Sequence, residues 1–260
     1  MFGGGAGGGD DGLGTTWIVT VPTENIDTKA KKSQNFGESM ADQGSRAGER
    51  YATAQILDYA ARTHHPDDPA LRRAFEAPSR HGMPEIQLGP AEGRLLELLL
   101  GLVGARRVVE IGTLAGYSAL WMARALPPGG HLWTIEADPT HAGVAAEVIG
   151  EAGLGDRVTI IKGDAADVLP ELRGSGPFCA VFLDADKGRY DVYGRWATEN
   201  LRPGGLLIGD NAYLFGRLLD DGDEARAMRR FHEEMARHYR SVCVPTPDGL
   251  AVGVRVEPEA

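Results

Sequence analysis

The chain has 260 residues, of which 42% are hydrophobic and 25% charged, a balance typical of a soluble globular protein with a sizeable core. The formal net charge of −10, with no dense basic cluster, argues against a nucleic-acid-binding surface. No run of about 18 apolar residues is present, so we expect no membrane span. Cys179 and Cys243 lie in apolar stretches, which favours free thiols over a disulfide and fits a cytoplasmic location.

The first 45 residues are rich in glycine and polar residues and begin MFGGGAGGGDDGLG. They predict a flexible tail, because glycine loses the most backbone freedom on ordering. A short ordered stretch at 15–21, and a role as an active-site flap or a dimer-crossing arm, stay open as alternatives. Over residues 46–103, apolar spacing predicts three helices: one that ends before His64, one from Asp68 to Ala77, and one that opens at Gly89–Pro90.

From residue 104 to residue 260, apolar strand-like runs alternate with helical patterns. The expected strands lie at 106–112, 131–137, 158–164, 177–185, 205–211, 241–246 and 250–256, and the expected helices at 118–126, 139–152, 166–172, 189–200 and 223–239. The last two strands flank Pro247–Asp248–Gly249, a turn signal for a hairpin. The alternation predicts an α/β fold, with a doubly wound, mostly parallel seven-stranded sheet, helices on both faces and a C-terminal antiparallel hairpin strand. Residues 46–260 would form a single domain, made of the N-terminal helices and this core.

Acidic residues stand where each of the five parallel strands is expected to stop. In chain order they are Glu110, Glu136 with Asp138, Asp164, Asp184 with Asp186, and Asp210. Ligands of such sheets bind beyond the carboxyl ends of the strands. The sequence therefore predicts an acidic, oxygen-rich cleft along that edge.

The stretch EIGTLAGYS, from Glu110 to Ser118, predicts a tight turn from a strand into a helix, whose first N–H groups point at a ligand. It is not the dinucleotide fingerprint, because Leu114 and Tyr117 stand where that pattern needs glycine. Glu136, at the next strand end, can accept hydrogen bonds from ribose hydroxyls. Taken singly, the turn and the acid have simple structural explanations, but together they favour an adenosine-containing ligand.

Five segments in order, VVEIGTLAGYSALWMA, IEADP, GDA, FLDADKGRYDVY and LRPGGLLIGDN, resemble the S-adenosylmethionine-dependent O-methyltransferases of the catechol and caffeoyl-coenzyme A type. The resemblance runs from about Met83 to the C-terminus and implies the Rossmann-like methyltransferase fold. In that family the matching positions hold the methionine part of the cofactor, its carboxylate, its ribose and its adenine. The cofactor-binding residues that it implies are Leu88, Glu110, Gly112, Thr113, Ser118, Glu136, Ala165 and Asp184.

The resemblance also implies a divalent cation, expected to be Mg²⁺, with Asp184, Asp210 and Asn211 as ligands. Three oxygen donors suit a hard cation, and the absence of histidine from these motifs argues against zinc. Lys187 matches the family's general base, and with Asp184 it is expected to be catalytic. The plainer alternatives are a helix N-cap for Asp184 and a solvated lysine. Asp186 could either orient Lys187 or cap a helix.

These motifs predict metal-dependent methyl transfer from S-adenosylmethionine to a hydroxyl of a catechol-like phenolic small molecule. The family resemblance implies a homodimer, and neither nucleic acid nor a membrane is an expected partner. One alternative is a nicotinamide-dependent oxidoreductase, but the chain has no Tyr-x-x-x-Lys pair. Another is a non-catalytic S-adenosylmethionine-binding protein, which the joint presence of Asp184, Lys187, Asp210 and Asn211 disfavours.

Overall fold

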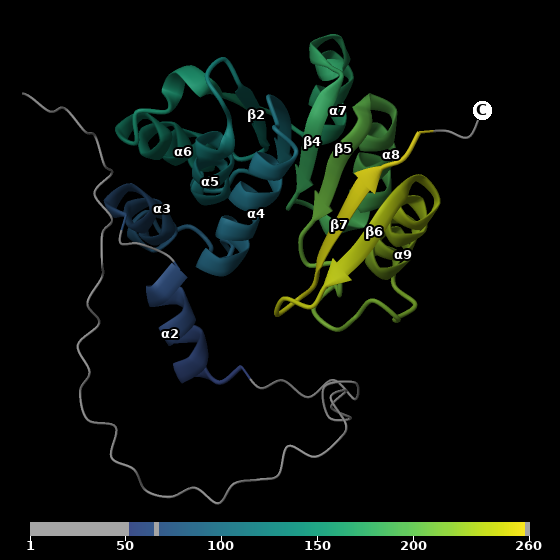
Figure 1. Cartoon of the computed structure of the whole chain (residues 1–260), viewed down its shortest axis with the longest axis horizontal. Helices are drawn as coiled ribbons and strands as arrows, with labels where there is room; N and C mark the ends of the chain where they lie inside the picture. Colours follow the sequence, from purple (N-terminus) through teal and green to yellow (C-terminus); the bar gives the residue numbers. More distant parts are fainter. Residues whose placement is uncertain (1–51, 65–67, 258–260) are drawn as a thin grey trace, which may run out of the picture. The chain divides into compact units, whose positions relative to one another are not determined.

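A computed structural model of the chain describes residues 52–64 and 68–257 (Figure 1). The predicted tail over residues 1–45 lies outside the described residues. Within the described residues, three helices precede the first strand, as predicted: α2 (Ala54–His64), α3 (Pro69–Arg80) and α4 (Pro90–Leu102). Helix α3 continues past Ala77 because Pro78 removes only one backbone donor close to the helix end. None of the helices in the described ranges is long and apolar enough to cross a bilayer.

Seven strands form one mixed sheet in the order β3-β2-β1-β4-β5-β7-β6. They are β1 (Arg107–Ile111), β2 (His131–Glu136), β3 (Val158–Lys162), β4 (Phe178–Leu183), β5 (Leu201–Gly209), β6 (Tyr239–Val244) and β7 (Leu250–Arg255). Strands β1 to β5 pair in parallel, whereas β7 runs antiparallel to both β5 and β6. The predicted α/β fold with its C-terminal hairpin is confirmed.

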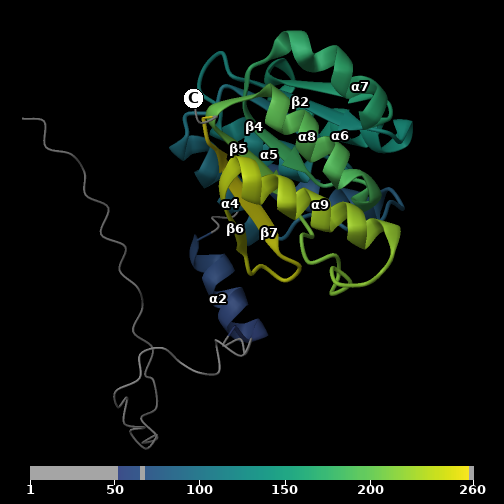
Figure 2. The same cartoon turned by 90° about the vertical axis from the view of Figure 1, so that its right-hand side faces the viewer.

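Helices cover both faces of the sheet. Helices α4, α5 (Tyr117–Ala125) and α6 (Pro139–Glu151) pack in one apolar core, and α7 (Ala165–Leu172), α8 (Tyr190–Asn200) and α9 (Asp223–His238) pack in the other (Figure 2). The central strands are therefore buried on both sides, which explains why they read as continuous apolar runs rather than as alternating patterns. Short 3-10 turns, η1 (Gly155–Arg157), η2 (Arg173–Ser175) and η3 (Lys187–Arg189), complete the connections.

Backbone hydrogen bonds hold the carboxyl ends of the parallel strands together. The first residue after a strand donates its N–H to the neighbouring strand: Gly112 to Ile135 O at 3.0 Å, Gly163 to Glu136 O at 2.9 Å, Asp184 to Ile111 O at 2.8 Å and Asp210 to Leu183 O at 2.9 Å. The segments that follow β1 to β5 therefore start side by side at one edge of the sheet.

The turn between β6 and β7 supports the segment that follows β5. Ala212 N donates to Gly249 O at 2.9 Å, and Tyr213 N donates to Asp248 O at 2.9 Å. The Asp248 carboxylate also accepts the N–H of Phe215 at 2.8 Å. The C-terminal hairpin thus fixes the backbone directly after the predicted ligands Asp210 and Asn211.

Candidate functional site

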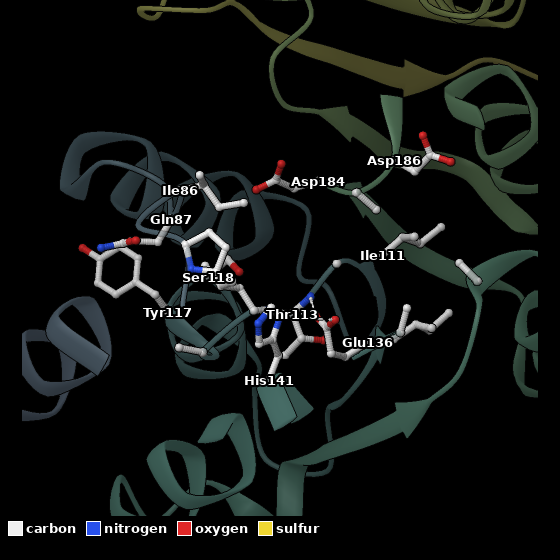
Figure 3. A pocket seen from close by; sticks show the side chains of 18 of the residues that line it. Ile86, Gln87, Ile111, Thr113, Tyr117, Ser118, Glu136, His141, Asp184 and Asp186 are labelled. Carbon is white, nitrogen blue, oxygen red and sulfur yellow. Dashed lines mark hydrogen bonds and ion pairs between the residues drawn. The ribbon is translucent and has the colours of Figure 1, made fainter. Parts of the chain in front are cut away.

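A cavity of about 270 Å³ lies beyond the carboxyl ends of β1 to β4. Its walls come from the segment before α4, the turn after β1, and the ends of β2, β3 and β4 (Figure 3). Of the eight residues predicted to bind a cofactor, seven line it: Leu88, Gly112, Thr113, Ser118, Glu136, Ala165 and Asp184. The eighth, Glu110, is fully buried and is not among the lining residues.

Gly112 is required where β1 passes β4. Its φ of +97° is one that side-chain-bearing residues rarely adopt, and a Cβ atom built there would lie 2.1 Å from the carbonyl oxygen of Asp184. Gly112 lines the cavity, and its tight contact is with the neighbouring strand, so Gly112 sets the position of Asp184.

Glu136 holds the turn after β1 as well as facing the cavity. Its Oε2 accepts the backbone N–H groups of Thr113 at 3.1 Å and Leu114 at 2.8 Å, and its Oε1 accepts that of Asp138 at 2.9 Å. A carboxylate has about four acceptor sites. The acid at the end of β2 therefore orders two cavity walls and keeps accepting capacity for a ligand.

Glu110 lies beneath the cavity and contacts hydroxyl groups. Its Oε1 is hydrogen-bonded to Ser118 Oγ, and its Oε2 accepts from Thr134 Oγ1 at 2.6 Å. Burial raises the pKa of Glu110 to about 8, and the charges of Asp184 and Glu136 act in the same direction. Glu110 contacts Ser118, which does line the cavity, so its predicted part in cofactor binding would act through that hydroxyl.

Asp184 connects the cavity to a second acid. Asp210, on the adjacent strand end, is 7% exposed, and burial together with the negative charge of Asp184 raises its pKa. Asn211 follows in a left-handed conformation with φ of +52°. Within the described residues, no three His, Cys, Asp or Glu side chains are grouped to hold a metal. A cation at this edge would therefore need the Asn211 amide beside the two carboxylates.

Lys187 reaches this acidic pair. Its Nζ lies 2.9 Å from Asp184 Oδ1 and 2.9 Å from the hydroxyl of Tyr190. Tyr190 is fully buried, and its hydroxyl is 3.0 Å from the carbonyl oxygens of both Leu183 and Asp210. Tyr190 was not predicted from the sequence. The available signal was an aromatic residue three positions after Lys187, where a helix begins.

Asp186 caps the turn rather than orienting Lys187. Its carboxylate accepts Gly188 N at 2.9 Å and Arg189 Nε at 2.7 Å. Arg189 also lies 2.7 Å from Asp164 Oδ1, so its guanidinium lowers the pKa of that carboxyl. Arg189 and Asp164 line the cavity, and the pair joins the ends of β3 and β4.

The sequence model of the O-methyltransferase family matches residues 61–256. The chain belongs to this family. It is therefore an enzyme that methylates oxygen, which confirms the prediction from the motifs and decides against the oxidoreductase and the non-catalytic alternatives. Catechol O-methyltransferase of Niastella koreensis is 42% identical over 200 residues, which cover 72% of this chain and 90% of the relative. Catechol O-methyltransferase of Mycobacterium tuberculosis is 42% identical over 174 residues, which cover 66% and 79%.

Solved structures of the same family share the fold. The O-methyltransferase TomG of Streptomyces achromogenes, in complex with S-adenosylmethionine, aligns with a TM-score of 0.73 at 35% identity and covers 78% of this chain and 96% of its own. An O-methyltransferase of Bacillus cereus, in complex with S-adenosylhomocysteine, aligns with a TM-score of 0.74 at 33% identity and covers 77% and 97%.

Proposed function

We propose that this O-methyltransferase transfers the methyl group of S-adenosylmethionine to one hydroxyl of a vicinal dihydroxy aromatic compound, with the help of a divalent cation. The observation that carries the proposal is the position of Asp184, which lines the cavity and also adjoins the buried acid Asp210 and Lys187. A donor site and an acidic, lysine-bearing site thereby share one residue. The names of the two catechol-methylating relatives support the acceptor class.

The donor site is assigned to the cavity. S-adenosylmethionine, when bound, supplies a methyl group activated by a sulfonium. Glu136 would accept hydrogen bonds from the ribose hydroxyls, and Ser118 would bind the carboxylate of the donor. The backbone of Ala165 would contact the adenine. The complexes of the two solved relatives with S-adenosylmethionine and S-adenosylhomocysteine support this choice of donor.

The donor set at Asp184, Asp210 and Asn211 fits a hard cation such as Mg²⁺, because all three residues offer oxygen. Burial and then the negative charge of Asp184 raise the pKa of Asp210, and within the described contacts only Lys187 offsets this pair of acids directly. A bound divalent cation would supply the Lewis acidity that orients and acidifies two vicinal hydroxyl groups.

Lys187 is assigned as the group that removes the proton of the reacting hydroxyl. A lysine amine can take a proton from a hydroxyl as a general base. Tyr190 holds the Nζ atom in place through its hydroxyl at 2.9 Å. The protein would thus accelerate methyl transfer mainly by positioning the two reactants. Its charged groups would also stabilise the charge that develops in the transition state.

The test is methyl transfer from S-adenosylmethionine to catechol, with resorcinol and phenol as controls, measured by mass spectrometry with EDTA or Mg²⁺. We expect catechol to be methylated, EDTA to abolish the transfer and Mg²⁺ to restore it. Asp184→Asn and Asp210→Asn should lose the activity, whereas Asp156→Asn, an exposed acid in η1 before β3, should keep it. Full activity of the first two variants in EDTA, or no preference for catechol, would refute the proposal.

We propose further that the active form is a homodimer located in the cytoplasm. The exposed apolar side chains of Leu98 and Leu102 on α4, at 54% and 83%, support a contact between copies. Light scattering behind size exclusion tests this point, and a monomer at micromolar concentration would speak against it.

A further inference from the structure

Four side chains form a hydrogen-bonded chain under the cavity floor. Ser118 contacts Glu110, Glu110 accepts from Thr134 at 2.6 Å, and Thr134 contacts Thr113. Glu110 and Thr134 are fully buried, whereas Ser118 and Thr113 at the two ends line the cavity. The protonation of the buried carboxyl can therefore reach a ligand through the two end hydroxyls as well as through its charge.

The number of hydrogen atoms in this network decides whether the hydroxyls of Ser118 and Thr113 can donate to a ligand. Three hydrogen bonds link the four groups. When Glu110 is ionised, it only accepts hydrogen bonds. The three hydroxyl groups then use all their hydrogens in the bonds among these four side chains. Both ends then present only lone pairs to the cavity. When Glu110 is neutral, it adds a fourth hydrogen, and one hydroxyl at an end is released to donate outward.

An anionic ligand group needs that released hydrogen. Ser118 cannot donate its single hydrogen to a ligand carboxylate and to Glu110 at once. If Glu110 donates to Ser118 instead, the serine hydroxyl turns to the cavity as a donor. An ionised Glu110 would leave acceptor oxygens facing a carboxylate, which is repulsive.

We infer that Glu110 is a positioning residue for the methyl donor, and that binding of the donor's carboxylate through Ser118 requires Glu110 to carry a proton. This inference rests on the proposed function, because it takes Ser118 as the site of that carboxylate.

The surroundings of Glu110 favour the neutral form at physiological pH. Burial raises its pKa to about 8, and the charges that act on it are those of Asp184 at the end of β4 and Glu136 at the end of β2, both negative. Helix α5 contributes the hydroxyl of Ser118. Because only the protonated fraction binds, the dissociation constant should be constant below about pH 7.5 and rise about tenfold per pH unit above pH 8.

The experiment measures binding of an S-adenosylhomocysteine analogue that lacks the α-amino group, so that the ligand does not titrate in this range. Calorimetry on the full chain runs from pH 6 to 10 in EDTA, so that no cation near Asp184 alters the charge at the site. Two buffers with different ionisation enthalpies report proton uptake. For the natural chain we expect the affinity to fall above pH 8 and close to one proton to be taken up at pH 9.

Glu110→Gln is the matched variant, because its amide nitrogen donates to Ser118 at every pH while its oxygen accepts from Thr134. It should bind the analogue at pH 7 and lose the fall in affinity and the proton uptake. 5′-Methylthioadenosine, which has no carboxylate, should bind the natural chain equally at pH 7 and 9.

A merely structural Glu110 would give the variant and the natural chain the same pH profile, and this result would overturn the inference. If the variant does not fold, the measurement on the unmodified protein is sufficient. Absence of proton uptake on binding at pH 9 would also overturn the inference. Failure of both proteins to bind S-adenosylmethionine at any pH would instead refute the proposed function.

Discussion

Replacement of Gly112 by alanine tests how the end of β1 positions the site. The added Cβ would lie 2.1 Å from Asp184 O, and the residue would be held at a φ of +97°. A side-chain-bearing residue in such a backbone region costs on the order of 1–3 kcal/mol. Overpacking adds about 1–3 kcal/mol, and here the obstacle is backbone that cannot rotate away.

The expected loss in the free energy of unfolding is therefore about 2–6 kcal/mol. At about 2–4 °C per kcal/mol for a domain of this size, the melting temperature should fall by about 4–24 °C. Gly153→Ala is the matched control, because Gly153 has a φ of +71° but nothing within 4 Å of the added Cβ. It should lose only the backbone part, about 1–3 kcal/mol.

Urea titrations of both variants give the free energies, and calorimetry gives the affinity for S-adenosylhomocysteine. We expect Gly112→Ala to weaken binding, because Thr113 and Asp184 move with the strand ends, and Gly153→Ala to leave binding unchanged. Equal losses of stability in the two variants would show that the close contact with Asp184 is relieved at no cost, and the reasoning would be wrong.

Three other changes have definite expected outcomes. Tyr190→Phe removes a hydrogen bond that holds Lys187 Nζ, so turnover should fall about 2- to 10-fold, from about 0.5–1.5 kcal/mol, while the KM for the donor stays constant in steady-state assays. Glu136→Gln removes the charge that would bind the ribose, and calorimetry should show S-adenosylhomocysteine binding weakened about tenfold or more. In EDTA, the free energy of unfolding should fall as pH rises from about 5 to 7. The raised pKa of Asp210 keeps a proton on the folded chain that the unfolded chain has already released. Asp210→Asn should reduce this slope, as measured by urea titrations.

A specific result would contradict each of these three predictions. A raised donor KM with unchanged turnover in Tyr190→Phe would remove Lys187 from the chemical step. Unaltered affinity in Glu136→Gln would leave that acid a purely structural role at the turn after β1. A pH slope that Asp210→Asn does not change would mean that burial and the charge of Asp184 do not raise the pKa of Asp210 in the folded chain.

The sequence was sufficient to predict the order of strands and helices and the edge at which the site lies. Apolar runs separated by helical patterns have few parallel arrangements, and the carboxyl ends of parallel strands always share one edge. The positions of Leu88, Gly112 and Glu136 around one cavity follow from that rule together with the family motifs.

Side-chain directions could not be predicted in the same way. Glu110 was expected at the cofactor, but it precedes the end of β1, and its side chain enters the buried layer beneath α5 and meets Ser118. Tyr190 escaped notice because its role comes from a contact with Lys187 and two carbonyl groups of neighbouring strands. The contact with Lys187 follows from residue spacing, but the contacts with the two carbonyl groups depend on tertiary packing, which residue spacing does not encode.

The support of the post-β5 segment by the C-terminal hairpin joins two parts of the chain that lie far apart in sequence. The residues assigned to the donor lie between Leu88 and Asp184, whereas the backbone after Asp210 is tied to Asp248 and Gly249, nearly forty residues later. If the acceptor binds beside Asp210 as proposed, exchange of that distal turn would alter the acceptor side more than the cavity assigned to the donor. The hairpin would then be the segment at which to change acceptor preference.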